Sequence, residues 1–188
     1  MSTGPHQHPS ISVALAITPS HFSSDNPHPN PTITLTAISD YPKPITIFTY
    51  NTIFHLDLSL YRSDFTCQDT TGTDTPRSMN IDVSKGPRRP AFSRESGGPD
   101  DEYFVTLEPN TPFEFQHAFW LVDGEEAPST FLPGHRYLLG AKEGAQVRWW
   151  QTGRKDDVMA PPGTKSLLGS AAGEPIPLNI GRVEFECV

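Results

Sequence analysis

The sequence predicts an all-β protein, folded as an antiparallel β-sandwich of seven to nine short strands. Apolar and polar residues alternate with a period of two in several segments, as in half-buried strands. Twenty prolines and fourteen glycines are spread along 188 residues, which indicates frequent turns. No long segment has a helical period, so we expect few and short helices.

Three segments show the alternation most clearly. Ile11, Val13, Leu15 and Ile17 share one face near the start of the chain, and Val183, Phe185 and Cys187 share one face at its end. Between residues 113 and 120 the aromatic residues Phe113, Phe115 and Phe119 share a face with His117. Further strands are expected at 32–39, 45–50 and 136–140, with a hairpin of 65–68 and 79–83. Both ends of the chain are expected to pair into sheet.

Length and composition indicate one domain over residues 1–188. Residues 1–9 are expected to be a flexible N-terminus. The segments 84–101 and 155–177 are rich in proline, glycine and charge, and are predicted to be long loops.

The formal charge of −8 disfavours nucleic acid and anionic lipid as partners. The only basic cluster, Lys85, Arg88 and Arg89, is interpreted as a solvated loop, with an anion-binding loop as the alternative. The first residues lack a basic segment before the apolar run, and no segment approaches the roughly 20 apolar residues of a membrane-spanning helix. We therefore expect no signal peptide, no membrane association and a soluble cytoplasmic protein.

Four segments carry a resemblance to a known family: Ile45–Thr52, Asp101–Pro109, Phe113–Ala118 and Leu132–Tyr137. Over residues 11–140 the chain resembles the propeptide domain of fungal deuterolysin-type metalloproteases. The resemblance implies an immunoglobulin-like sandwich. In the family this domain follows a secretory signal and precedes a His-Glu-x-x-His zinc helix. Neither feature is present here, so the resemblance supplies no catalytic residue.

Motifs for peptidase, kinase or hydrolase chemistry are absent from the sequence. No histidine is followed by glutamate, no Gly-x-Ser-x-Gly elbow occurs, and the Gly-Ser-Ala-Ala-Gly segment at 169–173 lacks the Lys-Ser or Lys-Thr ending of a phosphate loop. Cys67 and Cys187 stand in no metal or redox pattern, and we expect free thiols rather than a bridge. No metal ion or cofactor is predicted.

Five residues are candidates if the protein is an enzyme: His55, Asp57, Tyr103, Glu114 and His117. His55 and Asp57 share a face if residues 52–60 are extended, which makes them an acid/base pair or simply the polar face of a strand. His117 is interpreted as a hydrogen-bonded core histidine, with catalysis as the alternative.

Arg148, Trp149 and Trp150 are candidate binding residues. Adjacent side chains on a strand point to opposite sides, so one tryptophan is expected either on the surface, as a binding residue, or beneath the 155–177 loop. Two functions follow from these observations. The favoured one is a non-catalytic binding module for a protein partner or a small apolar ligand. The alternative is a small enzyme, of isomerase or cyclase type, acting on an apolar metabolite.

Overall fold

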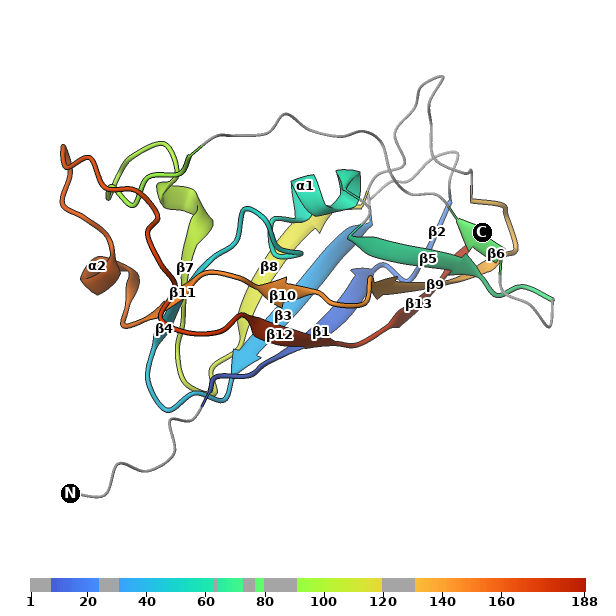
Figure 1. The fold of residues 1–188 in the computed structure, drawn as a ribbon. Helices are drawn as coiled ribbons and strands as arrows, with labels where there is room; N and C mark the ends of the chain where they lie inside the picture. The colour runs from blue at the N-terminus through green and yellow to red at the C-terminus, as the bar shows by residue number, and fades with distance from the viewer. Residues whose placement is uncertain (1–7, 24–30, 63, 73–76, 80–90, 120–130) are drawn as a thin grey trace.

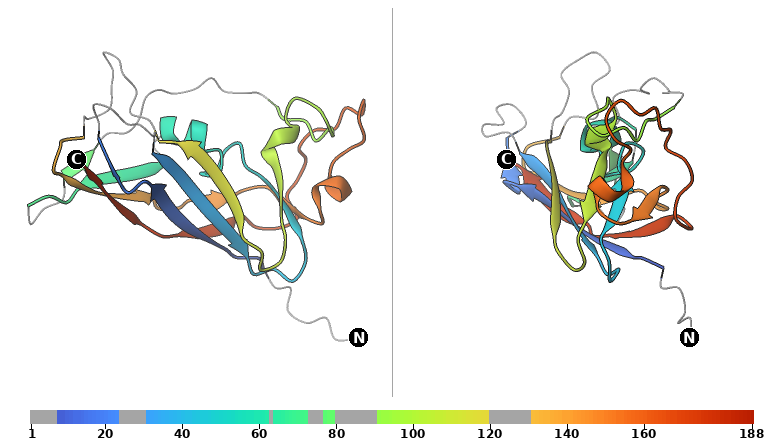
Figure 2. Two further views of the ribbon diagram at one scale, coloured as in Figure 1. Left: turned by 180° about the vertical axis from the view of Figure 1, so that it is seen from behind. Right: turned by 90° about the vertical axis from the view of Figure 1, so that its left-hand side faces the viewer.

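The computed structural model describes residues 8–23, 31–62, 64–72, 77–79, 91–119 and 131–188. The described residues form thirteen strands, two short α-helices and one 3₁₀ turn, so the predicted all-β class is confirmed. The strands build two mixed five-stranded sheets and one antiparallel three-stranded sheet, which curl around the interior, and the molecule is elongated (Figures 1 and 2). No helix in these segments is long and apolar enough to cross a bilayer.

The first sheet contains the two longest strands, which lie side by side at its centre. Its order is β10 (Gln146–Val147), β12 (Ile176–Ile180), β1 (Ile11–Thr18), β3 (Thr32–Ser39) and β8 (Phe113–Ala118). β1 and β12 are parallel, whereas the other neighbours are antiparallel. The predicted alternation of β1 is confirmed, because Ile11, Val13, Leu15 and Ile17 are all buried.

Two further sheets complete the molecule, one at each end (Figure 1). The three-stranded sheet has the order β11 (Trp150–Thr152), β4 (Ile45–Phe48) and β7 (Phe104–Leu107). The other has the order β2 (His21–Phe22), β13 (Val183–Cys187), β9 (Arg136–Ala141), β5 (Phe65–Asp69) and β6 (Arg77–Met79). The remaining elements are α1 (Leu56–Tyr61), α2 (Lys155–Val158) and the 3₁₀ turn η1 (Asp101–Tyr103).

The structure departs from the predicted strand count and direction. Several strands have only two or three residues, too few for an alternating pattern to mark them. Two pairs are parallel, β1 with β12 and β13 with β2. Alternation identifies a strand and its buried face, but the direction of its neighbour depends on the path of the connecting chain. The predicted hairpin forms between β5 and β6, although residues 80–83 lie outside the described part of the chain.

The buried residues form two apolar clusters. The larger takes in residues of all three sheets and includes a network of rings from Phe22, Phe119, Phe131, Tyr137 and Phe185. The smaller lies at the three-stranded sheet and has five buried members: Phe48, Tyr50, Phe104, Trp149 and Met159. Burial of one such side chain stabilises the fold by about 1.5–3 kcal/mol, so both clusters are major sources of stability.

The Leu-Pro-Gly segment before β9 forms a closed corner. The backbone N–H of Leu132 donates to the hydroxyl of Tyr137 at 2.7 Å, and the ring of Tyr137 is fully buried. Burial raises the pKa of Tyr137 above its ordinary value, so the hydroxyl stays protonated. Gly134 has a φ of 79°, which glycine adopts without strain, and its N–H donates to Cys187 at 2.7 Å. The corner thereby ties the start of β9 to the C-terminal strand.

The described parts of the predicted loops are held in place. The Arg94 N–H donates to Ser166 at 2.7 Å, and the Ala160 N–H donates to Arg94 at 2.8 Å, so residues 91–101 pair with the 155–177 segment. Residues 84–90 lie outside the described residues. Of the predicted flexible N-terminus, residues 1–7 are not described, while His8 contacts the ring of Trp150 and Pro9 is buried.

Both cysteines are free and buried, as predicted. Cys67 lies on β5 and Cys187 on β13, with β9 between the two strands. Burial raises the pKa of Cys67 to about 12, and the nearby charge of Asp69 acts in the same direction. This thiol is therefore protonated and unreactive at neutral pH.

Candidate functional site

Residues 52–60 form a turn and the start of α1, so the extended conformation that would place His55 and Asp57 on one strand face does not occur. The hydroxyl of Thr52 accepts from the Phe54 N–H at 3.2 Å, and Nδ1 of His55 accepts from the Leu58 N–H at 3.3 Å. His55 thus caps α1, whose six residues are too few for a stable isolated helix. The helix is stabilised by packing of Leu56 and its neighbours on the core.

His55 is half-buried against two tyrosine rings. Its ring centroid lies 5.5 Å from that of Tyr50 and 5.1 Å from that of Tyr103. Burial lowers the pKa of His55, although the charge of Asp57 opposes that change. Because Nδ1 accepts the cap hydrogen bond, the neutral ring carries its proton on Nε2. His55 and Asp57 do not share a strand face, because they follow one another around the first turn of α1.

Asp57 approaches the second candidate histidine across the gap between α1 and β8. Its carboxylate lies 3.8 Å from Nε2 of His117, and their side chains are 55% and 33% exposed. The predicted core histidine is therefore only half-buried. Glu114 lies on the opposite face of β8, where it accepts from the side chain of Gln116 at 3.1 Å. The structure thus brings His55, Asp57, Tyr103 and His117 to the N-terminus of α1 and separates Glu114.

Among the residues that the structure describes, β8 is an edge strand, and no other strand pairs with its outer side. The Phe119 N–H donates to Pro31 at 2.7 Å, toward β3, so the backbone groups of 113, 115 and 117 also point toward β3. Those of Glu114, Gln116 and Ala118 point away. Their N–H and C=O groups have no hydrogen-bond partner within the described segments.

The apolar face of the first sheet is buried at β3 but becomes partly exposed at β8. Leu35 of β3 is fully buried, whereas its partner Phe115 is only partly buried and stacks on Phe54 at 4.6 Å. One pair further along, Phe113 is 38% exposed beside the buried Ala37. An unpaired backbone edge and an exposed aromatic margin therefore coincide along one strand.

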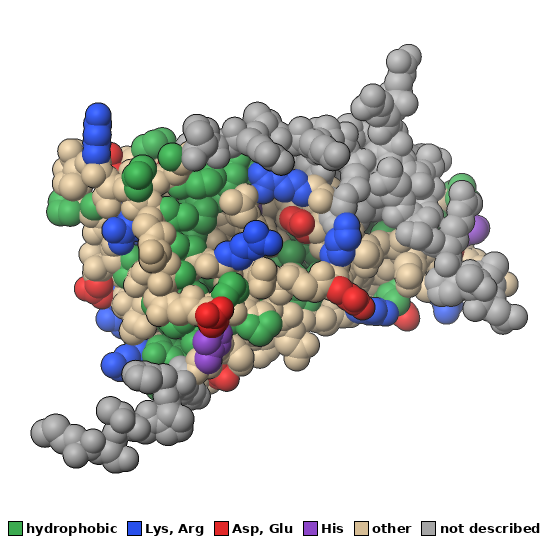
Figure 3. All heavy atoms as spheres, in the orientation of Figure 1, with side chains coloured by type: hydrophobic (Ala, Val, Ile, Leu, Met, Phe, Trp, Pro, Cys, Tyr) green, Lys and Arg blue, Asp and Glu red, His purple; other side chains and the backbone are tan. Residues whose placement is uncertain are grey.

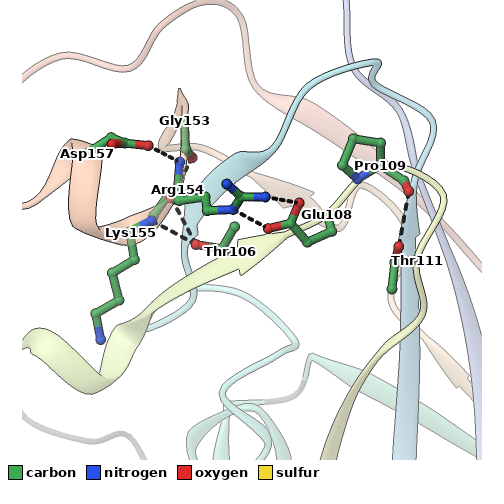
Figure 4. Close-up of polar contacts among 9 residues, drawn as sticks. Thr106, Glu108, Pro109, Thr111, Gly153, Arg154, Lys155 and Asp157 are labelled. Carbon is green, nitrogen blue, oxygen red and sulfur yellow. Dashed lines mark hydrogen bonds and ion pairs between the residues drawn. The ribbon is translucent and has the colours of Figure 1, made fainter.

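The turn that leads into β8 is fixed by α2. Arg154 binds Glu108 through two hydrogen bonds, of 2.7 and 3.3 Å, and the Lys155 N–H donates to the Thr106 hydroxyl at 2.8 Å (Figure 4). The ion pair with Glu108 raises the pKa of Arg154. Asn110 has a φ of 50°, a conformation that asparagine tolerates. These contacts connect the turn before β8 to the start of α2.

Trp149 and Trp150 are both only 5% exposed, so of the two alternatives for this pair the covered tryptophan is confirmed and the surface tryptophan is wrong. Trp149 packs on Phe104 in the smaller cluster. Trp150 belongs to the larger cluster, and its indole N–H donates to Glu174 at 3.0 Å. The 155–177 segment covers this ring, because Gly173 also packs against it.

Arg148 is exposed and lines a pocket of about 150 Å³ with Lys142, Asp64 and Glu143. Figure 3 shows side chains of both charges around a hollow in the face of the molecule that it presents. The volume is below the roughly 300 Å³ of typical ligand sites. None of the five candidate catalysts lines this pocket.

One histidine–carboxylate pair was not predicted from the sequence. Nδ1 of His135 and the carboxylate of Asp69 are 2.7 Å apart, and the Thr71 N–H donates to the same carboxylate at 2.9 Å. Burial raises the pKa of Asp69, but these hydrogen bonds outweigh burial and hold it below its ordinary value. The available signal was the Asp-Thr-Thr-Gly turn after a predicted strand. The pair fastens that turn to the start of β9.

Groups of three or more histidine, cysteine or carboxylate side chains placed to hold a metal ion do not occur among the described residues. Comparison with protein-family models, curated proteins and solved structures gives no match to this chain.

Proposed function

We propose that this protein is a non-catalytic binding module that takes up an extended segment of a partner protein along the edge of β8. The observation that carries the proposal is the row of outward backbone groups at Glu114, Gln116 and Ala118. Such a row is the template for strand addition, in which main-chain hydrogen bonds supply affinity and alternate side chains supply specificity.

β8 differs from the other sheet edges in length and protection. The other edge strands, β10, β11, β7, β2 and β6, have two to four residues, whereas β8 has six. Short edges, proline and lysine are the usual protection against edge pairing, and β8 contains neither residue. Its exposed Phe113 adds apolar surface that a partner strand would cover.

Two further considerations support a binding role. The resemblance to a propeptide domain agrees with it, because a propeptide works by engaging another polypeptide. The hydrogen bond from Leu132 to Tyr137 resembles the tyrosine corner of immunoglobulin-like sandwiches. We therefore also propose that the binding module is an immunoglobulin-like sandwich. Catalysis is not part of it, because Nδ1 of His55 is occupied by the hydrogen bond that caps α1.

Selection of displayed ten-residue peptides on the wild-type protein tests the proposal. Binding of the selected peptides should be at least about tenfold weaker for Gln116→Pro, whose ring removes an outward N–H and blocks the edge. The matched control is Gln116→Ala, which also loses the side-chain bond to Glu114 but keeps the backbone donor. Because the Gln116 N–H points away from β3, the proline variant retains the ladder to β3.

Hydrogen exchange provides a readout that does not depend on a variant. A bound peptide should slow exchange at the amides of Glu114, Gln116 and Ala118, and methylation of alternate peptide nitrogens should abolish its binding. Selected peptides that bind the proline variant normally and leave these three amides unprotected would refute strand addition at β8.

A further inference from the structure

We infer that the segment that adds to β8 carries a basic residue between two apolar residues, with the basic side chain opposite Glu114. The apolar side chains then lie on the inner face of the sheet, opposite Phe113 and Phe115. This inference rests on the proposed strand addition and specifies the chemistry of the partner.

The apolar positions of the partner segment are inferred from the partly exposed inner face of β8. Ile33 and Leu35 are fully buried, while the exposed fraction rises through Phe115 to 38% at Phe113. An added strand continues the alternation of its neighbour, so its residues opposite 113 and 115 point to this same face. Apolar side chains there would remove the exposed margin from water.

The basic position follows from charge on both faces of β8. Glu114 is exposed on the outer face, and Asp57 is 55% exposed beside His117 on the inner face. Residues 113–118 include no lysine or arginine, and the chain has a formal charge of −8. Opposite charges on neighbouring strands stabilise their pairing, so a lysine or arginine opposite Glu114 is favoured, and a second near Asp57 adds to the effect.

A second copy of this chain complements the edge less well. Antiparallel pairing of two β8 strands places Glu114 opposite Ala118 if the pair is centred on Gln116, or opposite Gln116 if it is centred on Phe115. In both registers the carboxylate has no cation opposite it. Centring the pair on Glu114 places two carboxylates opposite each other, which is unfavourable. The charge pattern thus favours a different, basic polypeptide.

Two labelled peptides test this chemistry: Thr-Val-Lys-Val-Thr-Lys and a twin with glutamate in place of both lysines. Fluorescence anisotropy should show about tenfold tighter binding of the lysine peptide to the wild-type protein, decreasing with added salt. The variant Glu114→Lys should reduce this preference at least about threefold, whereas Glu114→Gln should give an intermediate value.

The outcomes separate the two proposals. Equal affinity of both peptides, with protected amides at 114, 116 and 118, would overturn the basic partner and leave strand addition standing. Lysine preference that Glu114→Lys does not change would also overturn the inference. Dimers in sedimentation experiments that protect the same three amides without peptide would assign the edge to a second copy. If no peptide, selected or designed, protects these amides, strand addition itself is refuted.

Discussion

Two histidine–aspartate pairs occupy different settings in this molecule. His135 and Asp69 are 2.7 Å apart, and the aspartate side chain is 12% exposed. His117 and Asp57 are 3.8 Å apart, and the aspartate side chain is 55% exposed. The first carboxylate also accepts a backbone hydrogen bond from Thr71, so it is bound from two sides.

The difference shows how burial determines what the same two residue types do. A buried carboxylate that loses its donors retains the cost of desolvation, so the Asp69 pair fastens the structure. An exposed pair at longer distance contributes little to stability, because water screens it. Asp57 is thereby free to interact with a bound partner, whereas Asp69 is committed to the fold.

Removal of Asp69 should have the largest effect. Asp69→Ala deletes the acceptor for His135 and for the Thr71 N–H, and we expect a loss of about 1.5–3 kcal/mol in the free energy of unfolding, measured by urea denaturation. The matched control Asp57→Ala should stay within about 0.5 kcal/mol of wild type. Equal losses in the two variants would remove the distinction between the pairs.

The second-largest effect is expected in the pH dependence of the free energy of unfolding. The pKa of Asp69 is lower in the folded protein than in the unfolded chain, so the unfolded chain binds more protons as the pH falls below about 5. Stability from this group is present above that range and is lost as the pH falls through the folded pKa.

The wild type should therefore lose more stability between pH 5 and pH 3 than Asp69→Asn does. Asp40 and Asp101, whose pKa values are lowered by Ser10 and Lys155, remain in both proteins and act as an internal control. Parallel curves of the free energy of unfolding against pH would contradict this assignment.

The smallest effect is expected at the exposed pair. A double-mutant cycle with Asp57→Asn and His117→Gln should give a coupling energy below about 0.5 kcal/mol. The same cycle at Asp69 and His135 should give a clearly larger value. Strong coupling between Asp57 and His117 would mean that the two residues form a structural pair after all.

Local patterns in the sequence predicted the longer strands but not their surroundings. Alternation located β1 and β8 equally, yet β1 buries its apolar face and β8 exposes part of its own. The cause is position, because β1 has neighbours on both sides and β8 is at an edge. Position in a sheet depends on long-range pairing, which a period of two does not encode.

The candidate site was also predicted only in part, because contacts between distant segments are not encoded in local patterns. His55, Asp57, Tyr103 and His117 were chosen by residue type, and the structure places them near one helix end, although the strand assumed for residues 52–60 is a helix. The Asp-Thr-Thr-Gly turn marks Asp69 as a turn residue, but His135 is 66 positions away, so no local motif predicts the contact between them.

The adjacent tryptophans impose a constraint on how this chain can change. Trp149 belongs to the smaller cluster and Trp150 to the larger, since consecutive side chains point to opposite sides. Insertion or deletion of a single residue just before this dipeptide would turn each indole toward the wrong cluster. Spacing is therefore as restricted as residue identity at this point, and length variation should be tolerated only in the surrounding loops.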